Sequence, residues 1–187
     1  MRSSTKYSKE MVIKNRLGFH VRPVQRFAEL AGVFQSNIDV EIDGQKASGK
    51  SMLGLISLGG RCGSLMKIAT AGDDAGQAMG VLSYLVQENF FVEDDLNKDQ
   101  YPHRHITRLV TFASCFDSNV WVLHEGQKVN ARDSGALLAL GLKPTSEVQF
   151  VAEGPDSRQA REVLDTLVSY QFYVEDEMSA RAQRKVD

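Results

Sequence analysis

The chain repeats itself. An offset of 82 positions aligns residues 20–96 with residues 102–178 without a gap, and 26 of the 77 aligned pairs are identical. The clearest anchor is SNIDVEIDGQKA at 36–47 over SNVWVLHEGQKV at 118–129. Because a gapless match of this length indicates duplication of one small fold, we expect two domains, residues 1–96 and 97–187, with a polar junction at 97–103.

Both copies carry the same order of predicted elements. These are a helix (24–34; 106–116), a strand (37–43; 119–125), a Gly turn into a second strand (Gly44; Gly126), a short helix closed by glycine (52–58; 134–140), a strand ending in glycine (Gly72; Gly154) and a long helix. Asp74 and Gln77, like Asp156 and Gln159, predict a capping box for the long helix. One-sided strands and helices with a single apolar stripe predict a two-layer α+β fold, an open-faced sandwich with helices on one face of an antiparallel sheet.

One element is not repeated. Residues 11–16 (MVIKNR) predict a first strand in the first copy. The aligned residues 93–98 (EDDLNK) are acidic and polar, so we expect the second copy to lack this edge strand or to take one from elsewhere.

Composition excludes several classes of function. Lysine and arginine total 22 against 24 aspartate and glutamate, whereas nucleic-acid binding requires a basic surplus. No apolar run approaches the roughly 18 residues of a membrane span, and the polar first ten residues lack the apolar middle of a signal peptide. Cys62 and Cys115 have no metal-site or disulfide-scaffold spacing. We therefore expect a cytoplasmic protein with no nucleic-acid partner and no membrane insertion.

The stretch NRLGFHVRP (15–23) introduces the first helix of the first copy. His20 stands at the expected cap position, and the free N–H groups of a helix start favour a bound phosphate. Arg22 adds a planar fork of donors for the same anion. These positive surroundings favour the neutral, nucleophilic imidazole of His20. By these residues alone, His20 is either a catalytic residue or a helix cap.

NRLGFHVRP, followed by KSMLGLISLGG at 50–60, resembles the histidine-containing phosphocarrier protein (HPr) family of the bacterial phosphotransferase system. The family pattern is Gly-Leu/Ile-His-Ala-Arg-Pro, then Lys-Ser-Ile-Met-Gly and Leu-Gly, and the resemblance covers residues 11–96. Two motifs at the family's mutual spacing make the match specific. Phe19, Val21 and Val24 stand where the family usually has Leu/Ile, Ala and Ala, which adds bulk near His20.

The resemblance implies a phosphoryl carrier without a cofactor. His20 would accept a phosphoryl group from enzyme I and pass it to an enzyme II-type acceptor, and Arg22 would help to hold that group. Such a chain is a relay rather than a turnover enzyme. A regulatory alternative stays open, in which phosphorylation of His20 or Ser51 controls docking to a metabolic enzyme or a transcription factor.

Ser51 has two interpretations. By resemblance it matches the serine that HPr kinase phosphorylates in many bacteria. By the residues themselves it is the N-cap of the short helix, because its repeat partner is Asp133, another good cap. Met52 and Leu53, by resemblance, contribute to the docking surface for partners, although we expect one of the two to lie in the core.

The second copy does not carry the acceptor. Pro102 aligns with His20 and cannot accept a phosphoryl group. An offset acceptor at His103 or His105, beside Arg104, is an alternative that we do not favour. No metal site is predicted from His20, His103 and His105, because no carboxylate or cysteine joins them at ligand spacing.

The outward strand face also differs between the copies. In the first copy Asp39 and Glu41 face outward, whereas the aligned residues of the second copy are Trp121 and Leu123. Two large apolar side chains on an open sheet are typical of an interface. We expect this face to pack against the first copy or against a second chain in a homodimer; the alternative is a sheet that tolerates two exposed apolar residues.

Overall fold

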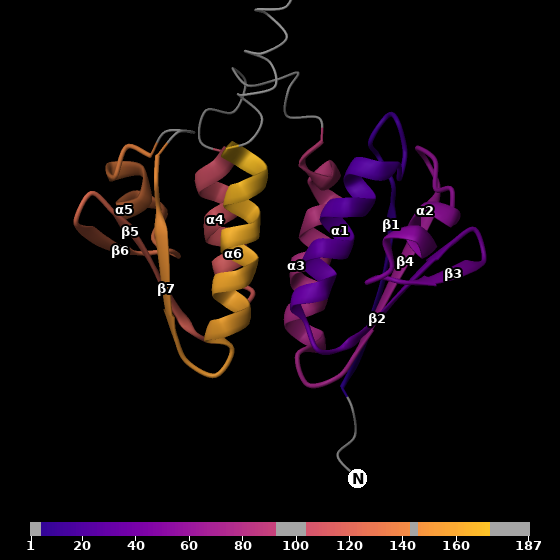
Figure 1. The fold of residues 1–187 in the computed structure, drawn as a ribbon, viewed down its shortest axis with the longest axis horizontal. Helices are drawn as coiled ribbons and strands as arrows, with labels where there is room; N and C mark the ends of the chain where they lie inside the picture. The colour runs from indigo at the N-terminus through magenta and orange to yellow at the C-terminus, as the bar shows by residue number, and fades with distance from the viewer. Residues whose placement is uncertain (1–4, 93–103, 143–145, 173–187) are drawn as a thin grey trace, which may run out of the picture. The chain divides into compact units, whose positions relative to one another are not determined.

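A computed structural model describes residues 5–92, 104–142 and 146–172 of the chain. The chain divides into two compact units, Met1–Leu96 and Asn97–Asp187. Each unit is a sheet with its long helices on one face (Figure 1). The predicted junction at 97–103 lies outside the described residues. Among the helices that are described, none has the length and apolar character needed to cross a bilayer.

Unit 1 contains a four-stranded antiparallel sheet. Its elements are β1 (Lys6–Val12), α1 (Val21–Val33), β2 (Asn37–Ile42), β3 (Gln45–Ser48), α2 (Met52–Ser57), β4 (Leu65–Ala71), α3 (Ala75–Gln87) and the short turn η1 (Asn89–Phe91). The strands lie in the order β1-β4-β2-β3. The β2–β3 turn places Asp43 and Gly44 at φ of 50° and 82°, the left-handed pair that an Asp-Gly hairpin requires.

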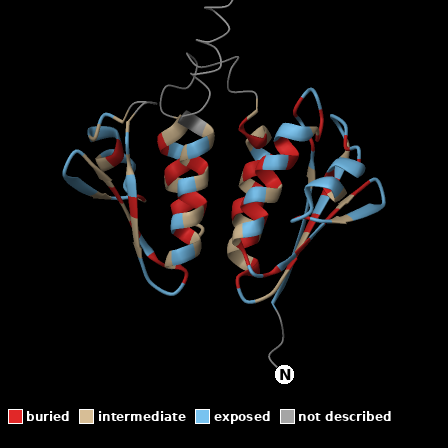
Figure 2. Ribbon diagram, viewed as in Figure 1, coloured by how far each residue is buried: buried red, intermediate tan, exposed pale blue. Residues whose placement is uncertain are grey.

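The core of unit 1 lies between the sheet and the pair α1 and α3. Ile38, Val40 and Ile42 alternate inward along β2 and are at most 2% exposed. The helix faces that meet them are buried; the opposite face of α1 is exposed, and that of α3 is mostly of intermediate exposure (Figure 2). The predicted two-layer α+β sandwich is therefore confirmed.

Unit 2 repeats this arrangement over its described residues with one strand fewer. Its elements are α4 (Arg104–Ala113), β5 (Asn119–His124), β6 (Gln127–Asn130), α5 (Ser134–Ala139), β7 (Gln149–Glu153) and α6 (Ser157–Phe172). The three strands lie in the order β6-β5-β7. In the part of unit 2 that the structure describes, β7 is therefore an edge strand, whereas its counterpart β4 is paired with β1.

Two sequence expectations need correction. The first strand was expected at 11–16 but covers Lys6–Val12, because its ladder with β4 begins at the pair Lys6 and Ala71. The capping box at the start of α3 is also wrong. Asp74 is the N-cap residue but its side chain makes no cap hydrogen bond; instead the carboxylate accepts from the backbone N–H groups of Gln35 and Ser36 over 2.7 and 2.8 Å.

The position of the boundary between the two copies explains why the sheet described in unit 2 has one strand fewer. The offset of 82 places the counterpart of β1 at residues 88–94, and Asn89–Phe91 within this span form η1 of unit 1. Phe90 and Phe91 are 1% and 4% exposed there. A segment whose side chains complete the core of the first unit cannot also be the first strand of the second.

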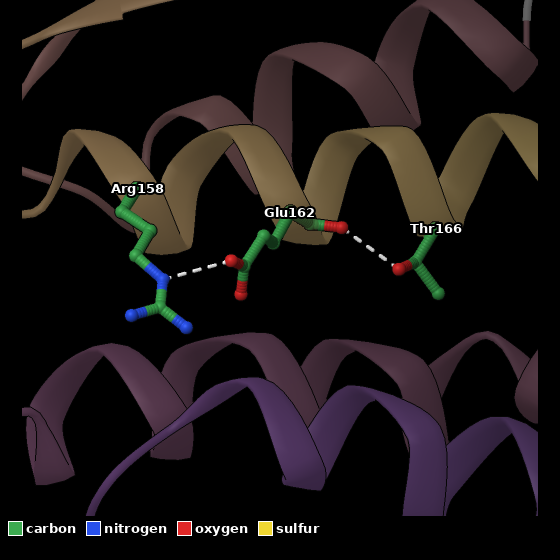
Figure 3. A network of polar contacts seen from close by, with 3 residues as sticks. All are labelled: Arg158, Glu162 and Thr166. Carbon is green, nitrogen blue, oxygen red and sulfur yellow. Dashed lines mark hydrogen bonds and ion pairs between the residues drawn. The ribbon is translucent and has the colours of Figure 1, made fainter.

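The last helix of unit 2 differs from its counterpart α3 at the position where β1 approaches α3 in unit 1. A Cβ on Gly76 of α3 would lie 3.5 Å from the ring of Tyr7 in β1. The counterpart of Gly76 in α6 is Arg158, whose Nε lies 2.8 Å from Oε1 of Glu162, and Thr166 donates to the Glu162 carbonyl over 2.7 Å (Figure 3). Unit 2 therefore has an exposed charged side chain where unit 1 has a glycine close to β1.

Candidate functional site

His20 is the N-cap residue of α1, but its side chain does not cap the helix. Its backbone is extended at φ −89° and ψ −173°, and its side chain makes no capping hydrogen bond. Its carbonyl accepts from the N–H of Val24 over 3.0 Å, which begins the helix. The structure therefore contradicts the interpretation of His20 as a capping side chain, and the imidazole is half-buried beside the first turn.

The environment of His20 favours the neutral imidazole. Burial lowers the pKa of His20 below its ordinary value of 6.5, and the positive charge of Arg22 lowers it further. The direction agrees with the sequence prediction, but burial rather than charge is the larger cause. A neutral imidazole has a nitrogen lone pair available for attack on phosphorus.

The loop before His20 is held against the loop before β4. Gly18 has a φ of +71°, and a Cβ on it would lie 2.5 Å from the carbonyl oxygen of Gly60. The next residue, Phe19, donates its backbone N–H to that same oxygen over 2.8 Å. Only glycine fits at position 18 because both the backbone conformation and the close approach exclude a side chain.

The bulky residues near His20 divide between core and surface. Phe19 and Val24 are 3% and 0% exposed, and Val21 is 56% exposed. The Phe19 ring lies 6.0 Å from Phe27 and 5.3 Å from Phe90. Of the three departures from the family pattern, only Val21 therefore changes the surface that a partner meets.

Exposed apolar side chains surround this helix start. Leu17 and Val21 flank His20 in sequence, and α2, which packs against α1, adds Met52, Leu53 and Ile56. Met52 and Leu53 are 38% and 81% exposed, so the expectation that one of them lies in the core is wrong. Leu55 supplies the core contact of α2 at 0% exposure. Leu17 and Ile56 were not predicted from the sequence.

Comparisons with known proteins agree with this geometry. The family model described as PTS HPr component phosphorylation site matches residues 7–88 and, a second time, residues 97–169. The chain belongs to the HPr family. It contains two copies of the family's unit in tandem.

Individual HPr proteins match about half of the chain each. The phosphocarrier protein HPr of Xylella fastidiosa is 33% identical over 85 residues, which cover 46% of this chain and 94% of that protein. The HPr-like protein Crh of Halalkalibacterium halodurans is 35% identical over 80 residues, 43% of this chain and 95% of that protein. The crystal structure of HPr-C-His from Thermoanaerobacter tengcongensis is 37% identical, with a TM-score of 0.45, and covers 46% of this chain and 98% of that chain.

Ser51 caps the second helix of the HPr unit. Its Oγ accepts from the backbone N–H of Gly54 over 3.1 Å, and the counterpart Asp133 accepts in the same way from Ala136 over 3.0 Å. The predicted capping role is present in both units. The side chain of Ser51 is also exposed, so capping leaves it accessible to a kinase, and its regulatory role stays a prediction.

The second HPr unit does not retain the apolar residues of α2. Ser134 and Gly135 of α5 replace Met52 and Leu53, and only Leu138, 44% exposed, keeps the apolar character of Ile56. Pro102 and His103 lie outside the described residues, and Arg104 and His105 form the start of α4. Unit 2 has therefore changed both at the acceptor position and at the surface beside it.

Trp121 and Leu123 lie on the face of β5 away from the helices. Val120 and Val122 alternate with them and are buried. Both outward residues are half-buried, and the Lys128 ammonium lies 4.3 Å from the centre of the Trp121 ring. The lysine stem partly covers the indole and makes a cation–π contact. An interface at this face stays a prediction.

Proposed function

We propose that this HPr-family chain is a phosphocarrier in which His20 of unit 1 accepts a phosphoryl group from enzyme I and passes it to an enzyme II-type acceptor. The supporting observation is the position of His20 at the N-cap of α1, with an imidazole that makes no capping hydrogen bond and has a lowered pKa. Unit 2 would have no acceptor, because Pro102 replaces the histidine. Such a carrier works in the cytoplasm and needs no cofactor.

The chemistry follows from these groups. A neutral imidazole nitrogen attacks the phosphorus, so an N–P bond forms while the bond from phosphorus to the donor breaks. The backbone N–H groups at the start of α1 and the Arg22 guanidinium offset the negative charge of the phosphoryl oxygens. In the second step an acceptor's nucleophile attacks phosphorus, and the N–P bond breaks to restore the neutral imidazole.

The exposed apolar residues Leu17, Val21, Met52, Leu53 and Ile56, which we call the apolar rim, would dock the partners. Leu17, Val21 and Leu53 are 70%, 56% and 81% exposed, and large apolar side chains grouped around a reactive residue are typical of a protein-binding surface. One surface would serve both enzyme I and the acceptor, because each partner must bring its reacting atom to the same imidazole.

The test uses labelled phosphoenolpyruvate and enzyme I with three forms of the chain. We expect acid-labile, base-stable label on the wild type, none on His20→Ala, and nearly unchanged label on His105→Ala. Adding an enzyme II-type acceptor should chase the label from the wild type. Substantial label on His20→Ala would contradict a single acceptor at His20.

A second candidate is a regulatory binding module in which Ser51 is the switch. Its exposed hydroxyl lies directly before Met52 and Leu53, so a phosphate added by an HPr kinase would place negative charge on the apolar rim. The chase experiment separates the carrier from a module that is switched by phosphorylation of His20, because label that no acceptor removes supports a switch. A switch at Ser51 is tested separately, by labelling the wild type and Ser51→Ala with an HPr kinase.

A further inference from the structure

The side chain of Asn15 fixes the peptide unit between Gly18 and Phe19, one residue before the proposed acceptor His20. Asn15 is 2% exposed, and its Nδ2 donates to the carbonyl oxygen of Gly18. The backbone N–H of Gly18 in turn donates to the Asn15 carbonyl over 2.9 Å. The loop is therefore closed by two hydrogen bonds two residues before His20.

This contact completes a clamp on one peptide unit. The peptide bond between Gly18 and Phe19 has its C=O held by Asn15 and its N–H held by the Gly60 carbonyl oxygen over 2.8 Å. With both dipole ends bound, the unit cannot rotate. The Gly18 carbonyl is thereby directed at the buried Asn15 amide.

The oxygen of the Asn15 side-chain amide, unlike its nitrogen, has no partner in the part of the chain that the structure describes. Among the described residues, Asn15 Oδ1 is buried with no hydrogen-bond partner. A buried acceptor without a partner loses its hydration and gains nothing in return, so the Oδ1 atom does not explain why an amide stands at this position. An amide at this position is explained by its donor rather than by packing.

We infer that Asn15 is a positioning residue for phosphoryl transfer, which turns the Gly18 carbonyl away from His20 and so stabilises the phosphorylated imidazole. Without the donor, that carbonyl can rotate toward the imidazole. A carbonyl oxygen there repels the phosphoryl oxygens and attracts an imidazolium proton. The inference rests on the proposed acceptor role of His20.

The test compares Asn15→Leu, which keeps the side-chain shape without the donor, with the wild-type chain. Both are phosphorylated chemically with phosphoramidate, without enzyme I, and hydrolysis of the phosphohistidine is followed by ³¹P NMR. We expect hydrolysis to be faster in Asn15→Leu by on the order of tenfold, and the ¹H titration midpoint of His20 to rise. A cooperative unfolding transition in urea should show that the variant is folded.

Two controls make the result decisive. Ser64→Ala removes the hydrogen bonds that the Ser64 side chain makes with Arg61 and Asp43 in the neighbouring loop. It should change neither the phosphohistidine lifetime nor the titration midpoint of His20. His20→Ala should carry no label at this site; if it is labelled like the wild type, the proposed acceptor is wrong. If the folded Asn15→Leu variant has the same phosphohistidine lifetime and the same His20 titration midpoint as the wild type, Asn15 has no positioning role.

Discussion

Arg26 of α1 donates a hydrogen bond from Nη1 to the carbonyl oxygen of Phe90 over 2.7 Å, between residues 64 positions apart. Both side chains are buried, Arg26 at 9% and Phe90 at 1% exposure. The bond ties η1 to the helix that begins at His20, the proposed acceptor. It holds within unit 1 the segment that the repeat would otherwise assign to the first strand of unit 2.

Replacing Arg26 by methionine keeps most of the apolar stem but removes the donor. A hydrogen bond that involves a charged group contributes about 1.5–3 kcal/mol, and we expect the free energy of unfolding of unit 1 to fall by about that amount. Urea unfolding followed by circular dichroism measures it. Gln25→Met, which removes only the exposed contact to Glu29, is the matched control. Equal losses in the two variants would rule out a special role for the Arg26 bond.

The imidazole of His20 should titrate below pH 6.5, because burial and Arg22 both lower its pKa. The unfolded chain therefore takes up this proton at a higher pH than the folded one, and the stability contributed by the neutral form is complete above 6.5 and is lost as the pH falls through the folded-state pKa. NMR titration measures the midpoint. Arg22→Gln should raise it only part of the way, since burial remains, and Arg61→Gln should leave it unchanged. A midpoint at or above 6.5 in the wild type would contradict this account.

Asp74 should stabilise unit 1 only when ionised. Burial opposes ionisation, but hydrogen bonds from Ser36 and Gln35 together with the charge of Lys50 outweigh it, so the pKa of Asp74 lies below 3.8. The contribution is present above pH 3.8 and is lost as the pH falls through the folded-state pKa. We expect Asp74→Asn to lower the free energy of unfolding by about 2 kcal/mol at neutral pH.

The pH dependence of that loss is the sharper measurement. The difference between wild type and Asp74→Asn should shrink on acidification below 3.8, measured by urea unfolding at several pH values. Asp73→Asn, at the exposed neighbouring position, should show little loss at any pH. A loss in Asp74→Asn that is independent of pH would show that the carboxylate charge is not what stabilises the loop.

Aspartate at position 51 should separate capping from docking. Asp133 caps α5 as Ser51 caps α2, so Ser51→Asp should keep the helix within the roughly 1 kcal/mol that a cap contributes. The added charge beside Met52 and Leu53 should slow phosphoryl transfer from enzyme I to His20. Ser51→Ala is the control, because it removes the cap without adding charge. Equal transfer rates for all three forms would leave Ser51 as a cap and nothing more.

The outward face of β5 is tested by adding charge to it. If Trp121 and Leu123 form an interface, Trp121→Asp with Leu123→Asp should lower the mass measured by light scattering or speed proteolysis at 97–103. Gln127→Asp with Ser134→Asp adds the same charge at exposed positions of unit 2 that do not belong to this face and should do neither. Unchanged mass and cleavage in the first variant would show that the face is free and that Lys128 alone covers the indole.

The sequence by itself determined the duplication and the order of elements, and it identified His20 as the candidate acceptor, which stays a prediction. The 82-residue offset follows from a comparison of the chain with itself. The period-2 alternation at Ile38, Val40 and Ile42 and the Asp43-Gly44 turn are local patterns, and short-range backbone preferences are enough to interpret them. NRLGFHVRP likewise places His20 and Arg22 on one helix turn whatever surrounds them. The predictions of strands, turns and the helix start hold because they depend on residues within a few positions of each other.

Only the tertiary structure decided how the local pieces are used. Asp74 looks like a helix cap in sequence, yet it binds backbone groups 38 and 39 positions away. Residues 89–91 look like part of the repeat, yet they close the core of unit 1 through Arg26. Met52 and Leu53 are large apolar residues of the kind that usually fill a core. Both are exposed, because Leu55 is the residue of α2 that faces inward. Each outcome is set by contacts between distant segments, in which burial and hydrogen bonding outweigh local preference.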